Sequence, residues 1–100
     1  MKLEIYAILD VKVKAFLPPI FQANNASAIR IFENCIKETG HPFNTNPGDY
    51  KLFHIGSFND IDASITPSDP QEISNGLTVS ALIAENSKLT LFPEVNEVKT

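Results

Sequence analysis

Cysteine, histidine and glycine are scarce in this chain of 100 residues, and the shortages exclude several classes of protein. The single cysteine, Cys35, has no partner within the chain, so the fold needs no oxidising compartment. The sequence has no run of about twenty apolar residues, which a membrane-spanning helix requires, and residues 1–10 lack the apolar core of a secretion signal. We therefore expect no association with a membrane, and a protein that stays in the cytoplasm of the cell that makes it.

Residue patterns for catalysis and cofactor binding are also missing. The four glycines are scattered, so the sequence contains no glycine-rich loop for phosphate. The two histidines, His41 and His54, fall short of the three or four converging ligands of a metal site. Cys35 lies on the apolar face of a predicted helix, which favours a buried thiol over a nucleophile. We predict that the protein is not an enzyme, uses no cofactor or metal, and acts by binding.

What the chain does contain is enough apolar residues for one compact domain. Hydrophobic residues make up 43% of the sequence and charged residues 20%, which is ordinary for a globular protein. A chain of this length buries roughly two thirds of its unfolded surface and forms one modest core. We predict a single α+β domain over residues 1–92 and a frayed C-terminal tail at residues 93–100.

The first part of the chain has the patterns of a strand, a loop and a helix. Residues 2–9 alternate in the period of a strand that places one face on a core. The adjacent prolines within residues 10–21 indicate an extended connecting loop along the surface. Apolar residues then recur at helical spacing between an asparagine cap, Asn24 or Asn25, and a stop at Gly40.

The second part begins with a reversal of the chain. Turn-forming residues fill 41–49, and the β-branched and aromatic residues of 50–58 predict a strand with a bulge at Gly56. Residues 59–62 predict a hairpin turn into a third short strand at 63–66, antiparallel to the second.

The prolines of residues 67–70 are expected to end the third strand. Beyond them, residues 77–83 and 88–92 have β propensity, although the first segment also fits a helical turn. The predicted architecture is a small, mostly antiparallel sheet with one principal helix packed on one face. Its order is β-α-β-β, with room for further C-terminal strands.

Charge is distributed unevenly along the chain. Residues 1–55 hold six basic and five acidic side chains, whereas residues 56–100 hold two basic and seven acidic ones. The first half is therefore suited to face a polyanion while the second faces solvent or a basic partner. The candidate contacts are Lys12, Lys14, Arg30 and Lys51 for phosphates, and Phe16, Phe21 and Tyr50 for stacking on bases.

Other uses of the same residues stay open at this point. The aromatic residues can form the core while the lysines keep the protein soluble. The apolar loop from Phe16 to Phe21 can serve as a self-association patch. Arg30, beside the apolar stripe of the helix, can lie along the edge of the core instead of contacting a ligand.

The order of features resembles the small nonstructural protein of gokushoviruses, which are single-stranded DNA bacteriophages of the microvirus family. The resemblance covers about residues 1–70. It depends on an opening Met-Lys-Leu-x-Ile-Tyr, on Ala-Phe-Leu-Pro-Pro-Ile-Phe at 15–21, on Ala-Ile-Arg-x-Phe at 28–32, and on Asn-Pro-x-Asp-Tyr-x-Leu-Phe-x-Ile-Gly-x-Phe at 46–58. The chain departs from the family pattern at Asn59, where aspartate is usual, and at Ala63, where glycine often closes the hairpin.

The resemblance implies a non-enzymatic factor that acts when the phage changes from duplex replication to making and packaging single-stranded genomes. By this analogy the partners are single-stranded DNA or the phage replication or capsid proteins, in the cytoplasm of the bacterial host. The alternative is a self-associating protein-interaction module, a homo-oligomer that does not contact DNA.

Overall fold

The computed structural model describes residues 1–95 and has an α+β fold. The strands are β1 (Lys2–Asp10), β2 (Ala15–Phe16), β3 (Ile20–Gln22), β4 (Tyr50–Asn59) and β5 (Ser64–Asn75). The helices are α1 (Asn25–Lys37), α2 (Pro42–Thr45), the 3-10 turn η1 (Pro47–Asp49) and α3 (Gly76–Val95).

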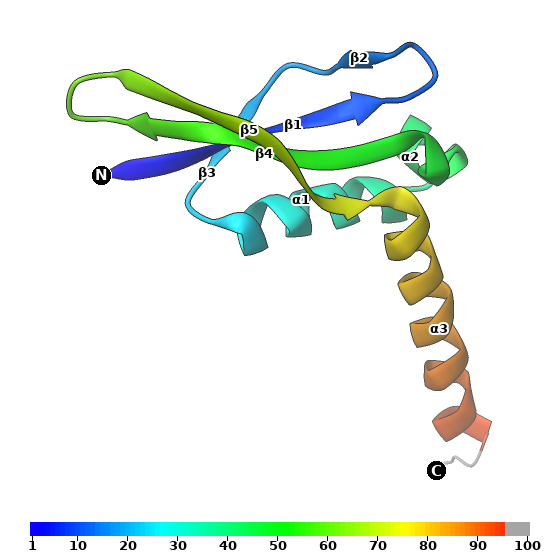
Figure 1. Cartoon of the computed structure of the whole chain (residues 1–100). Helices are drawn as coiled ribbons and strands as arrows, with labels where there is room; N and C mark the ends of the chain where they lie inside the picture. The colour runs from blue at the N-terminus through cyan, green and yellow to red at the C-terminus, as the bar shows by residue number, and fades with distance from the viewer. Residues whose placement is uncertain (96–100) are drawn as a thin grey trace.

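All the strand pairs are antiparallel, in the order β2-β1-β4-β5, with β3 beside β2 on the outer edge of β1. Figure 1 shows α1 against one face of this sheet and α3 extending away from its end. The core between the sheet and α1 is built on Tyr6, Phe32 and Leu52, whose side chains are fully buried. The predicted fold class is confirmed.

Local sequence explains where α1 begins and ends. The side chain of Asn24 accepts a hydrogen bond of 2.9 Å from the backbone N–H of Ser27, which is the expected asparagine cap. The helix ends at Lys37, shortly before Gly40, whose φ of +89° turns the chain. In the predicted turn region, His41 caps α2 by accepting a hydrogen bond of 3.0 Å from Phe43 N–H.

Residues 10–21, predicted as a connecting loop, contain two short strands. Phe16 in β2 pairs with Leu9, and Phe21 in β3 pairs with Ile5, so the segment follows the edge of β1. Leu17 N–H also donates to the carbonyl of Ile8 at 2.8 Å. The prolines between the two strands interrupt the pairing without moving the chain away from the sheet, because a proline is tolerated at an edge.

The third strand is longer than predicted. The prolines do not end β5, which runs through Pro67 and Pro70 to Asn75. Because β5 is an edge strand, its outward N–H positions need no partner and proline is accommodated there. The pairing shifts at this point, so that three residues of β5 lie opposite Ile55 alone.

The C-terminal segments 77–83 and 88–92, predicted as β-like, belong instead to α3. Asn75 caps this helix by accepting a hydrogen bond of 2.9 Å from Thr78 N–H. Val79 and Ile83, four residues apart on one helical face, belong to the core that also contains the buried face of α1, and this packing overrides strand propensity. The helix includes residues 93–95 of the expected tail, and residues 96–100 lie outside the described part of the chain.

Candidate nucleic-acid interface

The two faces of the sheet differ. The odd-numbered side chains of β1, from Leu3 to Leu9, point away from α1, and we call the surface on their side the open face. Ile5 and Ala7 are only 5% and 4% exposed, although they lie outside the core beneath α1. No helix within residues 1–95 covers this face (Figure 1), so side chains of neighbouring strands bury them.

Phenylalanines from three other strands provide that cover. Phe16 meets Phe53 edge to face, with ring centroids 5.5 Å apart, and Phe21 meets Phe58 in the same way at 5.5 Å. Each pair reaches across β1, because β2 and β3 lie on one side of it and β4 on the other. Phe16 is 48% exposed and Phe21 41%, so both present apolar ring surface to solvent.

A bulge in β4 places Phe53 and Phe58 on the same face. These residues are five apart, and regular alternation would put them on opposite sides of the sheet. Ile5 pairs with Gly56 whereas Tyr6 pairs with His54, so Ile55 is an extra residue that restores the alternation. At Gly56 a Cβ atom would lie 2.6 Å from the backbone oxygen of Thr66, which explains why glycine stands there. The predicted bulge is confirmed.

Three basic side chains, those of Lys12, Lys14 and Lys51, lie at one end of the open face. Lys51 lies opposite Leu9, and its Nζ is 3.9 Å from Glu72 Oε1. Lys12 and Lys14 lie in the turn that follows β1, where Asp10 Oδ1 accepts hydrogen bonds from the backbone N–H groups of Lys12 (3.0 Å) and Val13 (3.4 Å). Both turn lysines are exposed, and neither forms an ion pair with any residue that the structure describes.

The structure therefore brings together five of the seven residues selected from the sequence. These are Lys12, Lys14, Phe16, Phe21 and Lys51. The other two lie elsewhere. Tyr50 packs on Phe43 on the helix side of the sheet, at a centroid distance of 4.1 Å, and burial followed by the charges of Asp10 and Asp49 raises its pKa. Arg30 is exposed on α1, which covers the opposite face of the sheet.

Sequence reasoning missed Phe53 and Phe58 as parts of this surface. The signal that could have found them is Gly56: a bulge between the two rings changes the parity of the strand and brings both to one face. The residue pattern predicts the bulge itself, but the side on which each ring lies also depends on the register of β4 against β1.

Cys35 and His54, also considered from the sequence, lie outside this surface. Partial burial, and then Glu38, raise the pKa of the Cys35 thiol, which disfavours the reactive thiolate. His54 Nε2 lies 2.8 Å from Glu4 Oε1. Within residues 1–95 no three metal-ligating side chains gather, and none of the helices is long and apolar enough to cross a membrane.

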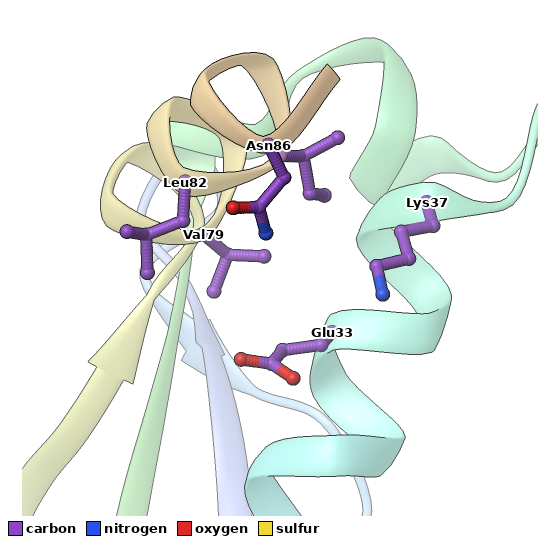
Figure 2. Close-up of a pocket in the computed structure, with 6 residues that line it drawn as sticks. Glu33, Lys37, Val79, Leu82 and Asn86 are labelled. Atoms are coloured by element: carbon purple, nitrogen blue, oxygen red, sulfur yellow. The ribbon is translucent and has the colours of Figure 1, made fainter. Parts of the chain in front are cut away.

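A hollow lies on the helix side of the molecule, between α1 and α3. Figure 2 shows Glu33 and Lys37 of α1 across from Val79, Leu82 and Asn86 of α3. These residues and Ile83 line the hollow, which has a volume of about 140 Å³. None of the residues selected for nucleic-acid binding lines it. Its lining mixes apolar groups with one charge of each sign, which gives no preference for an anion.

One family of known proteins matches most of the chain. The family model described as Phage ORF5 protein matches residues 3–79. No curated protein and no solved structure matches. The matched segment runs from β1 to the start of α3 and includes every residue assigned above to the open face.

Proposed function

The chain belongs to the Phage ORF5 protein family, a family of bacteriophage proteins, and from this premise we propose that it binds single-stranded DNA on its open face without catalysing a reaction. The observation that carries the proposal is the placement of exposed Phe16 and Phe21 on one sheet face, with Lys12, Lys14 and Lys51 at its end. Aromatic rings on a sheet with nearby cations are a common arrangement for binding unpaired bases and their phosphates.

Single strands suit this surface better than duplex. A ring on a flat sheet face can stack only on a base whose own face is free, and the bases of a duplex are stacked on each other. The lysines supply a contact with phosphate that depends on salt and not on sequence. Asp60 and Asp62 lie in the turn at the opposite end of β4 from Lys51, so that end of the sheet does not attract phosphate.

The biological role that we propose follows the resemblance to the gokushovirus nonstructural protein. The protein acts in the cytoplasm of the bacterial host when the phage begins to synthesise and package single-stranded genomes. Its partners are the single-stranded DNA and the replication or packaging machinery that handles it.

A fluorescence titration with a labelled oligonucleotide of about thirty nucleotides, at roughly 50 mM salt, tests the proposal. We expect saturable binding that weakens as salt is raised and that falls when Lys12 and Lys14 are both replaced by Gln. Lys37→Gln, together with Arg30→Gln, removes the same charge from α1, on the other side of the sheet, and is the control. Absence of binding by the wild-type protein, or equal losses in both double variants, refutes the interface.

Self-association is the second candidate, and one observation favours it. Ile65, opposite Phe58 in the sheet, is 60% exposed, so apolar surface continues from the phenylalanines to the edge strand. Two copies can bury such faces against each other as a pair of packed sheets. Light scattering distinguishes the two functions: a stable dimer that is disrupted by Phe16→Glu and that does not bind DNA supports the second, and a strict monomer excludes it.

A further inference from the structure

The two exposed rings of the open face have a defined spacing along β1. Phe16 lies opposite Leu9 and Phe21 lies opposite Ile5, four residues earlier on the same strand. At about 3.3 Å per residue, this offset is about 13 Å. One base cannot span that distance, so the two rings form separate stacking positions.

The segment between the rings restricts changes in this spacing. Phe16 and Phe21 lie in β2 and β3, which both pair with β1, and Pro18 and Pro19 stand between them. The prolines fix their φ angles, and Leu17 N–H donates to the carbonyl of Ile8. A ligand therefore meets two rings whose separation is set before binding, and it loses little free energy in ordering them.

The two positions differ in charge. Leu9 has Phe16 on one side and Lys51 on the other, and the turn with Lys12 and Lys14 follows directly. Ile5 has Phe21 on one side and Gly56, which has no side chain, on the other. The Phe16 position thus combines a ring with cations, whereas the Phe21 position offers aromatic surface with no cation among its strand partners.

We infer that a single DNA strand binds in two unequal steps, and this inference depends on the proposed function. The Phe16 position, with the lysines, anchors one nucleotide through stacking and phosphate contacts. The Phe21 position adds a second stacked base only when the strand is long enough to reach it. Because the second contact is intramolecular once the first is made, it raises affinity without adding a phosphate contact.

NMR titrations of the full chain with a thymidine dinucleotide and a thymidine octanucleotide test this inference. At about 3.4 Å per stacked nucleotide, the dinucleotide is too short for both rings and the octanucleotide is long enough. A stacked base contributes about 1–3 kcal/mol, so loss of one ring is expected to weaken binding by about fivefold or more. Phe21→Leu keeps apolar cover over Ile5 while removing the aromatic face, and Phe21→Tyr keeps the ring.

We expect Phe21→Leu to weaken octanucleotide binding by about fivefold or more and dinucleotide binding by less than about twofold, at low and high salt alike. Phe16→Leu weakens both, whereas Phe21→Tyr, which keeps the ring, and Ile61→Ala, which removes an exposed apolar side chain from the turn after β4, leave both unchanged. If Phe21→Leu leaves the octanucleotide affinity unchanged, or weakens both ligands equally, the two-step inference is wrong although DNA binding stands. If the wild-type protein binds neither ligand at roughly 50 mM salt, the proposed function falls and the inference falls with it.

Discussion

The phenol of Tyr6 in β1 donates a hydrogen bond of 2.7 Å to Oδ1 of Asn25, the first residue of α1. Tyr6 is fully buried, and its ring lies between the sheet and the helix. The neighbouring Asn24 caps the same helix end. One pair of asparagines thus both starts α1 and holds its first turn over the central strand.

Replacing Tyr6 with Phe removes this bond and leaves Asn25 Oδ1 without its partner. We expect the free energy of unfolding to fall by about 1 kcal/mol, the usual value for such a bond. Urea denaturation followed by circular dichroism measures it. Asn25→Ala in the wild-type and Tyr6→Phe backgrounds completes a double-mutant cycle. Losses that simply add would show that the two side chains do not stabilise each other.

Stability is expected to decrease at alkaline pH, partly through Tyr6. Burial, and then the Glu4 carboxylate, raise the pKa of this phenol, so the folded protein holds the proton more tightly than the unfolded chain does. The raised pKa stabilises the folded state fully below the unfolded pKa of about 10. This stabilisation is lost as the pH rises above that value towards the higher pKa of the folded state.

Tyr50 and Cys35 act in the same direction, because burial also raises their pKa values. The contribution of Tyr6 is therefore isolated by comparing how the free energy of unfolding changes with pH in wild type and in Tyr6→Phe. Urea denaturation from about pH 8 to about pH 11 gives both curves. We expect a shallower decrease in the variant. Equal slopes for the two proteins would contradict the assignment.

Gly56→Ala is expected to destabilise the protein by about 2 kcal/mol or more, since the new Cβ would lie 2.6 Å from the backbone oxygen of Thr66. The paired backbone of β5 cannot shift to make room for the methyl group as a flexible side chain can. Gly48→Ala is the control, because its Cβ would meet only the flexible end of the Leu77 side chain at 3.3 Å. Thermal denaturation of both variants gives the comparison, and equal losses would contradict the argument from the bulge.

Ala63→Gly is expected to stabilise the hairpin between β4 and β5. Ala63 has a φ of +62°, a left-handed conformation that costs alanine about 1 kcal/mol and costs glycine little. We expect a gain somewhat below this value, because glycine also loosens the unfolded chain. The same change at Ala26, exposed in α1, should have the opposite sign and destabilise by about 1 kcal/mol. Denaturant midpoints measure the change in stability of both variants. Destabilisation by Ala63→Gly would contradict the claim that the left-handed conformation of Ala63 is strained.

Arg30→Ala and Lys51→Ala remove equal charge from opposite sides of the sheet. Lys51→Ala is expected to reduce the slope of log affinity against log salt by about 0.7, the value for one phosphate contact on a single strand. Arg30→Ala should leave both affinity and slope nearly unchanged. Oligonucleotide titrations over a salt series provide the measurement. A larger loss of affinity or of slope in Arg30→Ala than in Lys51→Ala would show that the DNA binds on α1 and not on the open face.

Local patterns were sufficient for the elements whose signal lies in adjacent residues. The alternation of residues 2–9 identified β1, and an asparagine cap with a helical stripe identified α1. Residue propensity predicted the wrong structure where contacts with neighbouring strands or helices determine it. Pro67 and Pro70 predicted the end of a strand, but at the sheet edge their missing N–H groups need no partner. Residues 77–83 became helical because Val79 and Ile83 bury one face in the core shared with α1.

The sequence by itself determined the fold class, an α+β fold, together with a cysteine on the apolar face of a helix, a bulge at Gly56 and an N-terminal half that holds six of the eight basic residues. These features depend on residue types and on spacings within a single element. Only the tertiary structure decided which aromatic residues share a surface. Tyr50 lies on the helix side of the sheet and Phe53 on the open face, and Phe58 joins Phe53 because the extra residue Ile55 changes the parity of β4. Pairing between strands sets that parity, and pairing is a property of the folded sheet.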